Sequence, residues 1–150
     1  ISAAGYSPAG RPVAEIVETR PGSHWAIDRL RALELSHSPR AIMLDAHSPA
    51  AVLATDPLLA DSITTPSPRE IAAGTGALLD GIRDSSITLR TDSGLARALD
   101  CLTLRNVGDL GQMFDRKRSP GSTAPLEAAT LALTGLTLST ETAPPPTIWT

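Results

Sequence analysis

The chain has 150 residues and a formal net charge of −3, which fits one domain and excludes a uniformly basic nucleic-acid-binding protein, although not a local basic patch. Its single cysteine excludes a disulfide framework and a zinc site built from cysteines. No apolar run approaches the roughly 18 residues that a membrane-spanning helix needs. We therefore expect a cytoplasmic protein without a membrane segment. Because the first residues resemble the interior of an element rather than a signal peptide, we expect a fragment of a longer chain.

The first 40 residues predict a β-hairpin followed by a helix. Ile1–Gly5 and the β-branched stretch Pro12–Thr19 are the expected strands, separated by a turn that contains Pro and Gly. Ser23 is the expected N-cap of the helix, because apolar residues at roughly helical spacing follow it as far as Pro39.

The stretch Arg40–Asp45 is a short apolar run that ends on a carboxylate, and a short helix from Ser48 to Leu53 is expected after it. It predicts a buried strand that brings Asp45 to the edge of a sheet. Two interpretations of Asp45 are open at this point. The carboxylate caps the following helix, or it holds a hard divalent cation such as Mg²⁺ at the carboxyl end of a strand, where open α/β sheets bind ligands.

Ser67 begins the clearest local pattern in the chain. Ser at the N-cap, Pro at the first helical position and Glu70 three residues after the cap predict a capping box. Gly74 and Gly76 lie inside the helix that follows, where each glycine costs about 1 kcal/mol relative to alanine. Two such residues predict close packing against a neighbouring element, or a break in the helix near Gly74.

The remaining elements continue the alternation of strands and helices. We expect strands at Ser62–Thr65, Ile87–Arg90 and Leu110–Phe114, and helices at Ser93–Arg105 and from Ser122 or Thr123 to Gly135. This order predicts an α/β layered fold that is mostly parallel and opens with an antiparallel hairpin. Residues 1–136 are the expected domain, and the Thr- and Pro-rich residues 137–150 are expected to be a disordered tail.

Common catalytic signatures are absent from the sequence. The segment Gly74-Thr75-Gly76 lacks the rest of a phosphate-binding loop, no Ser has the flanking glycines of a nucleophile elbow, and there is no His-Glu-x-x-His. His47 follows Asp45 by two residues, so it either shares a metal ion with Asp45 or lies in a loop. Likewise, the basic run Arg116, Lys117 and Arg118 is either a solvated loop or a set of phosphate contacts near the active face.

Several stretches are similar, in order and spacing, to those of one known family. They are Val17–Trp25, Ile42–Ala50, Glu70–Asp80, Leu95–Asp109, Phe114–Lys117 and Ala124–Leu133. Over about residues 1–136, the chain resembles the C-terminal nuclease domain of the large terminase subunit of tailed bacteriophages and prophages. The resemblance implies a ribonuclease-H-like fold, a mixed sheet flanked by helices, which in this chain lacks its first strand.

The resemblance also implies two metal ions, Mg²⁺ or Mn²⁺, held by carboxylates from the first strand, a later strand and the start of a C-terminal helix. Only Asp45 carries over as a metal-binding and catalytic residue. The first acidic residue of the family would precede Ile1, and Ser122 stands where the family usually has an Asp. Asp115 or Glu127 is a possible substitute, but the spacing does not choose between them.

The expected function is therefore that of a metal-dependent DNA endonuclease that cuts concatemeric DNA during genome packaging, in the cytoplasm of an infected or lysogenic bacterial host. By the same resemblance, its partners are double-stranded DNA, an N-terminal ATPase motor domain, the small terminase subunit and the portal. The shortage of carboxylates keeps an alternative open, a non-catalytic ribonuclease-H-like scaffold that binds DNA or packaging proteins. An unrelated α/β binding module is the third interpretation.

Overall fold

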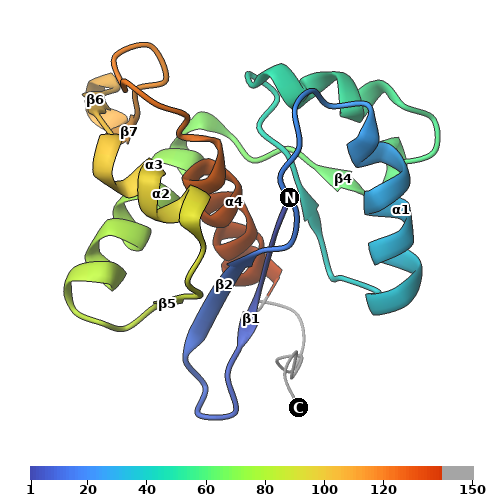
Figure 1. Ribbon diagram of the computed structural model, residues 1–150, viewed down its shortest axis with the longest axis horizontal. Helices are drawn as coiled ribbons and strands as arrows, with labels where there is room; N and C mark the ends of the chain where they lie inside the picture. The colour runs from blue at the N-terminus through green and yellow to red at the C-terminus, as the bar shows by residue number, and fades with distance from the viewer. Residues whose placement is uncertain (140–150) are drawn as a thin grey trace.

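The computed structural model describes residues 1–139 and shows a mixed α/β fold in which small sheets pack around a central helix, α4 (Figure 1). Helix α4, Ala124–Ser139, is red-brown in Figure 1 and lies against β1, β2 and β3 as well as α2 and α3. No helix within residues 1–139 is long and apolar enough to cross a membrane.

The predicted N-terminal hairpin is confirmed. Strand β1, Ser2–Tyr6, pairs in antiparallel fashion with β2, Pro12–Ile16, and the turn between them contains Gly10 at a φ of 75°. A glycine suits this position because the positive φ is unfavourable for residues that carry a Cβ atom. Strand β5, Thr88–Leu89, pairs in parallel with β2, so the strand order of this sheet is β1-β2-β5 and β1 is at its edge.

A second sheet holds the strand that the sequence predicted before Asp45. Strand β3 is shorter than expected, because it pairs only over Ile42–Met43 with the two-residue strand β4, Ile63–Thr64. The pairing is parallel, and the backbone N–H of Leu44 extends it by donating to the carbonyl of Thr64 at 3.0 Å. The predicted short helix after β3 is a 3₁₀ helix, Pro49–Thr55, whose N-cap is Ser48.

A third sheet corrects one helix prediction. The helix expected over Ser93–Arg105 ends at Cys101 as α3, Ser93–Cys101, and strand β6, Leu104–Asn106, follows it. Strand β6 pairs with β7, Gln112–Phe114, in antiparallel fashion. Pairing with β7 gives residues 104–106 interstrand hydrogen bonds in place of helical ones, and this explains the early end of α3.

The predicted N-cap is observed for α2 but not for α1. Helix α2, Pro68–Arg83, begins with the predicted capping box, in which the Ser67 hydroxyl and the Glu70 carboxylate each accept from the other's backbone N–H. Helix α1, Trp25–His37, has His24 as its N-cap without a side-chain cap bond, so the prediction of Ser23 as the cap is wrong. The Ser23 carbonyl takes part instead, accepting from the N–H of Ala26 at 3.0 Å.

The core is formed where α2, α3 and α4 meet the first sheet. Its buried members are mostly small or aliphatic, as the low aromatic content predicts: Ala14, Leu78, Leu95, Ala98, Phe114, Leu126, Ala129 and Leu133. A smaller cluster under α1 contains Ala26, Leu44 and Leu53. The strand β3 therefore lies between the two apolar clusters, because Leu44 joins the smaller one while Met43 packs on α4.

Helix α4 approaches its neighbours closely at two glycines. At Gly74 in α2, a Cβ atom would overlap the Oγ1 atom of Thr134, whereas at Gly76 nothing lies within 4 Å. Close packing at Gly74, one of the two predicted outcomes, is thus confirmed, and α2 continues without a break. At Gly135 in α4, a Cβ atom would lie 2.5 Å from Cγ of Met43.

The end of α4 bears on the expected domain boundary. Helix α4 continues through Ser139, so residues 137–139 of the predicted tail are helical. Residues 140–150 of that predicted tail lie outside the described residues.

Candidate functional site

Asp45 is buried at the carboxyl end of β3, with 6% of its surface exposed. One carboxylate oxygen, Oδ1, accepts the backbone N–H of His47 at 2.8 Å, and the other, Oδ2, accepts Nη2 of Arg116 at 2.6 Å. Ser48, rather than Asp45, caps the 3₁₀ helix, by accepting from the N–H of Ala50. The helix-cap interpretation of Asp45 is therefore wrong, and its carboxylate instead closes a turn and forms an ion pair.

Glu127 brings a second carboxylate to the same place from the first turn of α4. Its Oε1 atom accepts from the hydroxyl of buried Thr123 at 2.6 Å. Its Oε2 atom accepts from Nε of Arg116 at 2.7 Å and lies 2.5 Å from Nη2 of the same side chain. A hydroxyl on one oxygen and a guanidinium on the other hold the Glu127 carboxylate in one orientation.

Arg116 joins two carboxylates that are far apart in the sequence. Nη2 of Arg116 contacts both Asp45 and Glu127, and Nη1 donates to the backbone carbonyl of His47 at 3.3 Å. The hydrogen bond to Glu127, followed by that to Asp45, raises the pKa of Arg116 above its ordinary value despite the opposing effect of burial. The guanidinium is therefore fully charged and acts as the cation of a three-residue cluster, which we call the Arg116 bridge: Asp45, Arg116 and Glu127.

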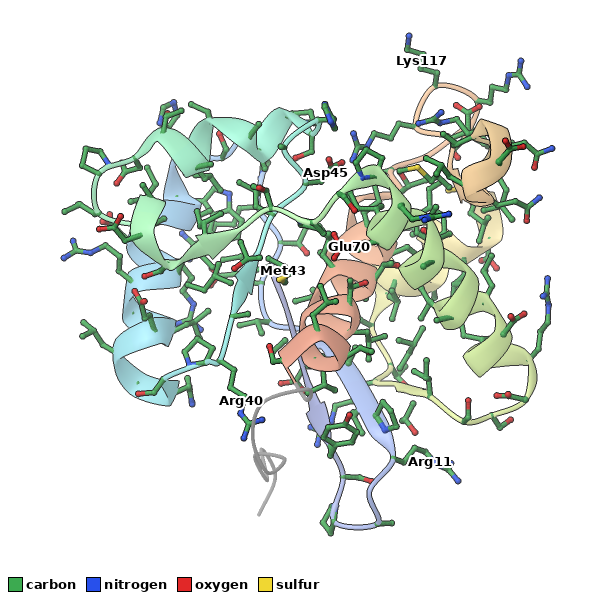
Figure 2. All side chains as sticks on the ribbon, turned by 180° about the vertical axis from the view of Figure 1, so that it is seen from behind. Arg11, Arg40, Met43, Asp45, Glu70 and Lys117 are labelled. Carbon is green, nitrogen blue, oxygen red and sulfur yellow. The ribbon has the colours of Figure 1, made fainter. Side chains whose placement is uncertain are left out.

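The side chain of Asp115 stabilises the turn that follows it in the chain, next to the Arg116 bridge. Its buried carboxylate accepts the backbone N–H groups of Lys117 at 3.0 Å and Arg118 at 3.1 Å, which folds the basic run into a tight turn. The side chains of Lys117 and Arg118 remain exposed, and Figure 2 shows Lys117 projecting away from the protein at the end of the molecule that carries Asp45. The turn thus exposes Lys117 and Arg118 directly after Arg116, with Nε of Arg118 3.7 Å from Oδ2 of Asp115.

The donor set of the Arg116 bridge suits a hard divalent cation in one respect. Two carboxylates already converge on a single positive group, and Mg²⁺ sites often consist of one or two carboxylates completed by phosphate oxygens of a substrate. However, residues 1–139 contain no group of three or more His, Cys, Asp or Glu side chains placed to hold a metal ion. The side chain of His47 is exposed, and only its backbone contacts Asp45, so the loop interpretation of His47 holds.

The structure distinguishes the two substitutes considered for the missing carboxylate. Glu127 shares the guanidinium of Arg116 with Asp45. Asp115 instead uses Oδ1 to accept the backbone N–H groups of Lys117 and Arg118. Ser122 has a local role too, since its hydroxyl accepts the N–H of Ala124 at 3.3 Å, at the start of α4. No sequence pattern indicates Arg116 as a partner of both carboxylates, because its place in a basic run indicates solvent or phosphate contacts.

Comparisons of the chain with protein-family models, with curated proteins and with solved structures find no match.

Proposed function

We propose that this chain is a ribonuclease-H-like nuclease domain of the phage terminase type, a metal-dependent DNA endonuclease. The observation that carries the proposal is the meeting of Asp45 and Glu127. Asp45 follows the strand β3, and Glu127 lies in the first turn of α4. The end of a strand and the start of a C-terminal helix are two of the three places that supply metal ligands in the family that this chain resembles.

The arrangement of the sheets supports the same proposal. Both β1 and β3 pack on α4, and each is an edge strand with no second neighbour on one side within residues 1–139 (Figure 1). A ribonuclease-H-like sheet, as the resemblance implies it, has a further strand that carries the first acidic residue of the family. Such a strand would pair with the open edges of β1 and β3, and it would bring the first acidic ligand of the family towards Asp45.

In this proposal, Asp45 and Glu127 hold Mg²⁺ or Mn²⁺. The bound metal would activate a water molecule and stabilise the leaving oxygen of a phosphodiester. Thr123 fixes the orientation of the Glu127 carboxylate through its hydroxyl. The exposed cations Lys117 and Arg118, together with Arg116, contact the DNA backbone, because phosphate contacts position a nuclease without reading sequence.

Plasmid nicking tests the proposal. We expect the protein to nick supercoiled plasmid in the presence of Mn²⁺ or Mg²⁺, and Asp45→Ala to abolish the nicking. The matched control is Asp61→Asn, which alters an exposed carboxylate outside the Arg116 bridge and should leave nicking unchanged. Absence of nicking by the wild-type protein at high concentration, or equal nicking by Asp45→Ala, contradicts endonuclease activity at this site.

A second candidate function is a scaffold that binds DNA without cutting it. It is favoured by the Arg116 bridge itself, since both carboxylates are paired with one guanidinium and no third acidic ligand joins them within residues 1–139. The two functions differ in one outcome. A scaffold retains duplex DNA by gel retardation and loses affinity on Lys117→Ala, yet never nicks plasmid with either metal.

A further inference from the structure

We propose that Arg116 is a built-in substitute for the metal ion, and that nucleic acid releases the carboxylates by drawing its guanidinium away. Binding of nucleic acid and binding of a divalent cation are then positively coupled in this chain. The inference rests on the proposed metal and DNA binding at Asp45, and it adds how the two ligands depend on each other.

Arg116 occupies the position between Asp45 and Glu127 that a bound metal ion would take. The Nη2 atom of Arg116 lies 2.6 Å from Asp45 and 2.5 Å from Glu127, so one donor atom sits between the two carboxylates. A metal ion that uses both carboxylates needs the same position. Because both ion pairs must break before the metal enters, the Arg116 bridge weakens metal binding by the free protein.

When the guanidinium of Arg116 leaves the two carboxylates, a phosphate group of the nucleic acid becomes its new partner. A guanidinium pairs with a phosphate group through two parallel hydrogen bonds, much as it pairs with a carboxylate. Arg116 belongs to the turn that also carries exposed Lys117 and Arg118, and its own side chain is 38% exposed. A phosphodiester held by these neighbours lies within the reach of a flexible side chain that is already partly in solvent.

Nucleic acid and a divalent cation then stabilise each other's binding. Once Arg116 pairs with phosphate, Asp45 and Glu127 carry two negative charges side by side, with Asp45 almost fully buried. A divalent cation relieves this repulsion, and Mg²⁺-like ions accept phosphate oxygens as additional ligands. Each ligand therefore lowers the cost of binding the other, and thermodynamic linkage requires that the two effects on affinity be equal.

Duplex binding at different Mn²⁺ concentrations tests the coupling. The affinity of the wild-type protein for a short fluorescein-labelled DNA duplex is measured by anisotropy at constant ionic strength, with and without Mn²⁺. Divalent cations ordinarily weaken protein–DNA binding because they compete for phosphate. We expect the opposite here, an increase in duplex affinity of about tenfold, the range of ordinary coupling between two sites. The duplex carries nuclease-resistant phosphorothioate linkages, so that cleavage expected from the proposed function does not alter the anisotropy, and a denaturing gel verifies that it stays intact.

Two variants assign the effect to the Arg116 bridge. In Asp45→Asn combined with Glu127→Gln, Mn²⁺ should no longer raise duplex affinity. In Arg116→Ala, Mn²⁺ should bind without DNA, measured as loss of the free Mn²⁺ signal in electron paramagnetic resonance, while the wild-type protein alone leaves that signal unchanged. Circular dichroism verifies the fold of each variant, and the wild-type duplex measurement remains decisive where a variant does not fold.

The outcomes separate this inference from the proposed function. Unchanged or weakened duplex binding of the wild-type protein in Mn²⁺, no duplex binding at all, or the same increase in the carboxylate variant overturns the coupling, even where nicking is observed. Conversely, a tenfold increase without nicking supports the coupling and removes only the cleavage step.

Discussion

Replacing glycine by alanine should change the stability of the protein in opposite directions at two positions of α2. Gly74 and Gly76 are both inside α2, and an alanine at either position gains up to about 1 kcal/mol from helix propensity. At Gly76 no atom lies within 4 Å of the new methyl group. We therefore expect Gly76→Ala to stabilise the protein by about 0.5–1 kcal/mol.

At Gly74 the same methyl group would overlap Oγ1 of Thr134 and lie 3.4 Å from Cγ2 of Thr130. Both threonines are buried on α4, and the Thr134 hydroxyl is held by its hydrogen bond to the Thr130 carbonyl at 2.8 Å. Overpacking of this kind costs about 1–3 kcal/mol, which exceeds the gain in propensity. We expect Gly74→Ala to be less stable than Gly76→Ala by about 2 kcal/mol, although the two changes are chemically identical.

Thermal unfolding followed by circular dichroism measures the difference. For a chain of this size, 2 kcal/mol corresponds to a separation in Tm of roughly 6 °C between the two variants. The variant Thr134→Ala removes the overlapping hydroxyl, so the double variant with Gly74→Ala should lose less stability than the sum of the single changes. Equal stability of Gly74→Ala and Gly76→Ala would refute the close approach of α2 and α4.

Three further predictions follow from contacts described above. Ser67→Ala removes the hydroxyl that caps α2 and should lower the free energy of unfolding by about 1 kcal/mol in urea denaturation. Hydrogen bonds from Ser67 lower the pKa of Glu70, so its stabilising contribution is complete above the ordinary carboxyl pKa and is lost as pH falls through the lowered value. The stability difference between the wild type and Glu70→Gln should therefore shrink between about pH 6 and about pH 3, and a constant difference would contradict it. Arg116→Ala leaves the buried carboxylate of Asp45 without its cation and should lower the free energy of unfolding in urea by about 2 kcal/mol, a value reduced because the Arg116 side chain is 38% exposed. The control Lys117→Ala should change that free energy by less than about 0.5 kcal/mol, because Lys117 is exposed.

Local interactions made part of this fold predictable from the sequence. The capping box at Ser67 involves groups three residues apart, and the hairpin of β1 and β2 was indicated by a turn that contains Pro and Gly and by the β-branched residues of β2. Each depends on neighbours in the chain, so the pattern of residues contains the information.

The end of α4 was mispredicted for an identifiable reason. Thr-rich sequence after Gly135 is typical of a tail, because threonine has a low helix propensity. In the structure, the hydroxyls of Thr130, Thr134 and Thr137 each donate to the carbonyl four residues earlier. This bond satisfies the hydroxyls of buried Thr130 and Thr134 within the core, and exposed Thr137 forms the same bond in the last part of α4, which continues to Ser139.

The candidate site shows the limit of reading charges along a chain. The apolar run before Asp45 predicts a buried acid at the end of a strand, and the structure confirms it, but the partner of that acid comes from a different part of the chain. Arg116 lies between acidic Asp115 and basic Lys117 in the sequence, and neither neighbour indicates a bridge to Glu127 and Asp45. Only the packing of α4 beside β3 places these groups within hydrogen-bonding distance.

The position of α4 at the centre of the fold also has a consequence for synthesis of the protein. Helix α4 follows every strand and helix that it packs against, and its most distant partner in the sequence is β1. During translation, the hairpin and α2 must therefore wait with their apolar faces uncovered until Leu126 and Leu133 have been made. Contacts between elements so far apart in sequence slow folding, because a long loop must close before they form. We expect a nascent chain that stops before Ala124 to remain protease-sensitive and to gain protection only when α4 is complete.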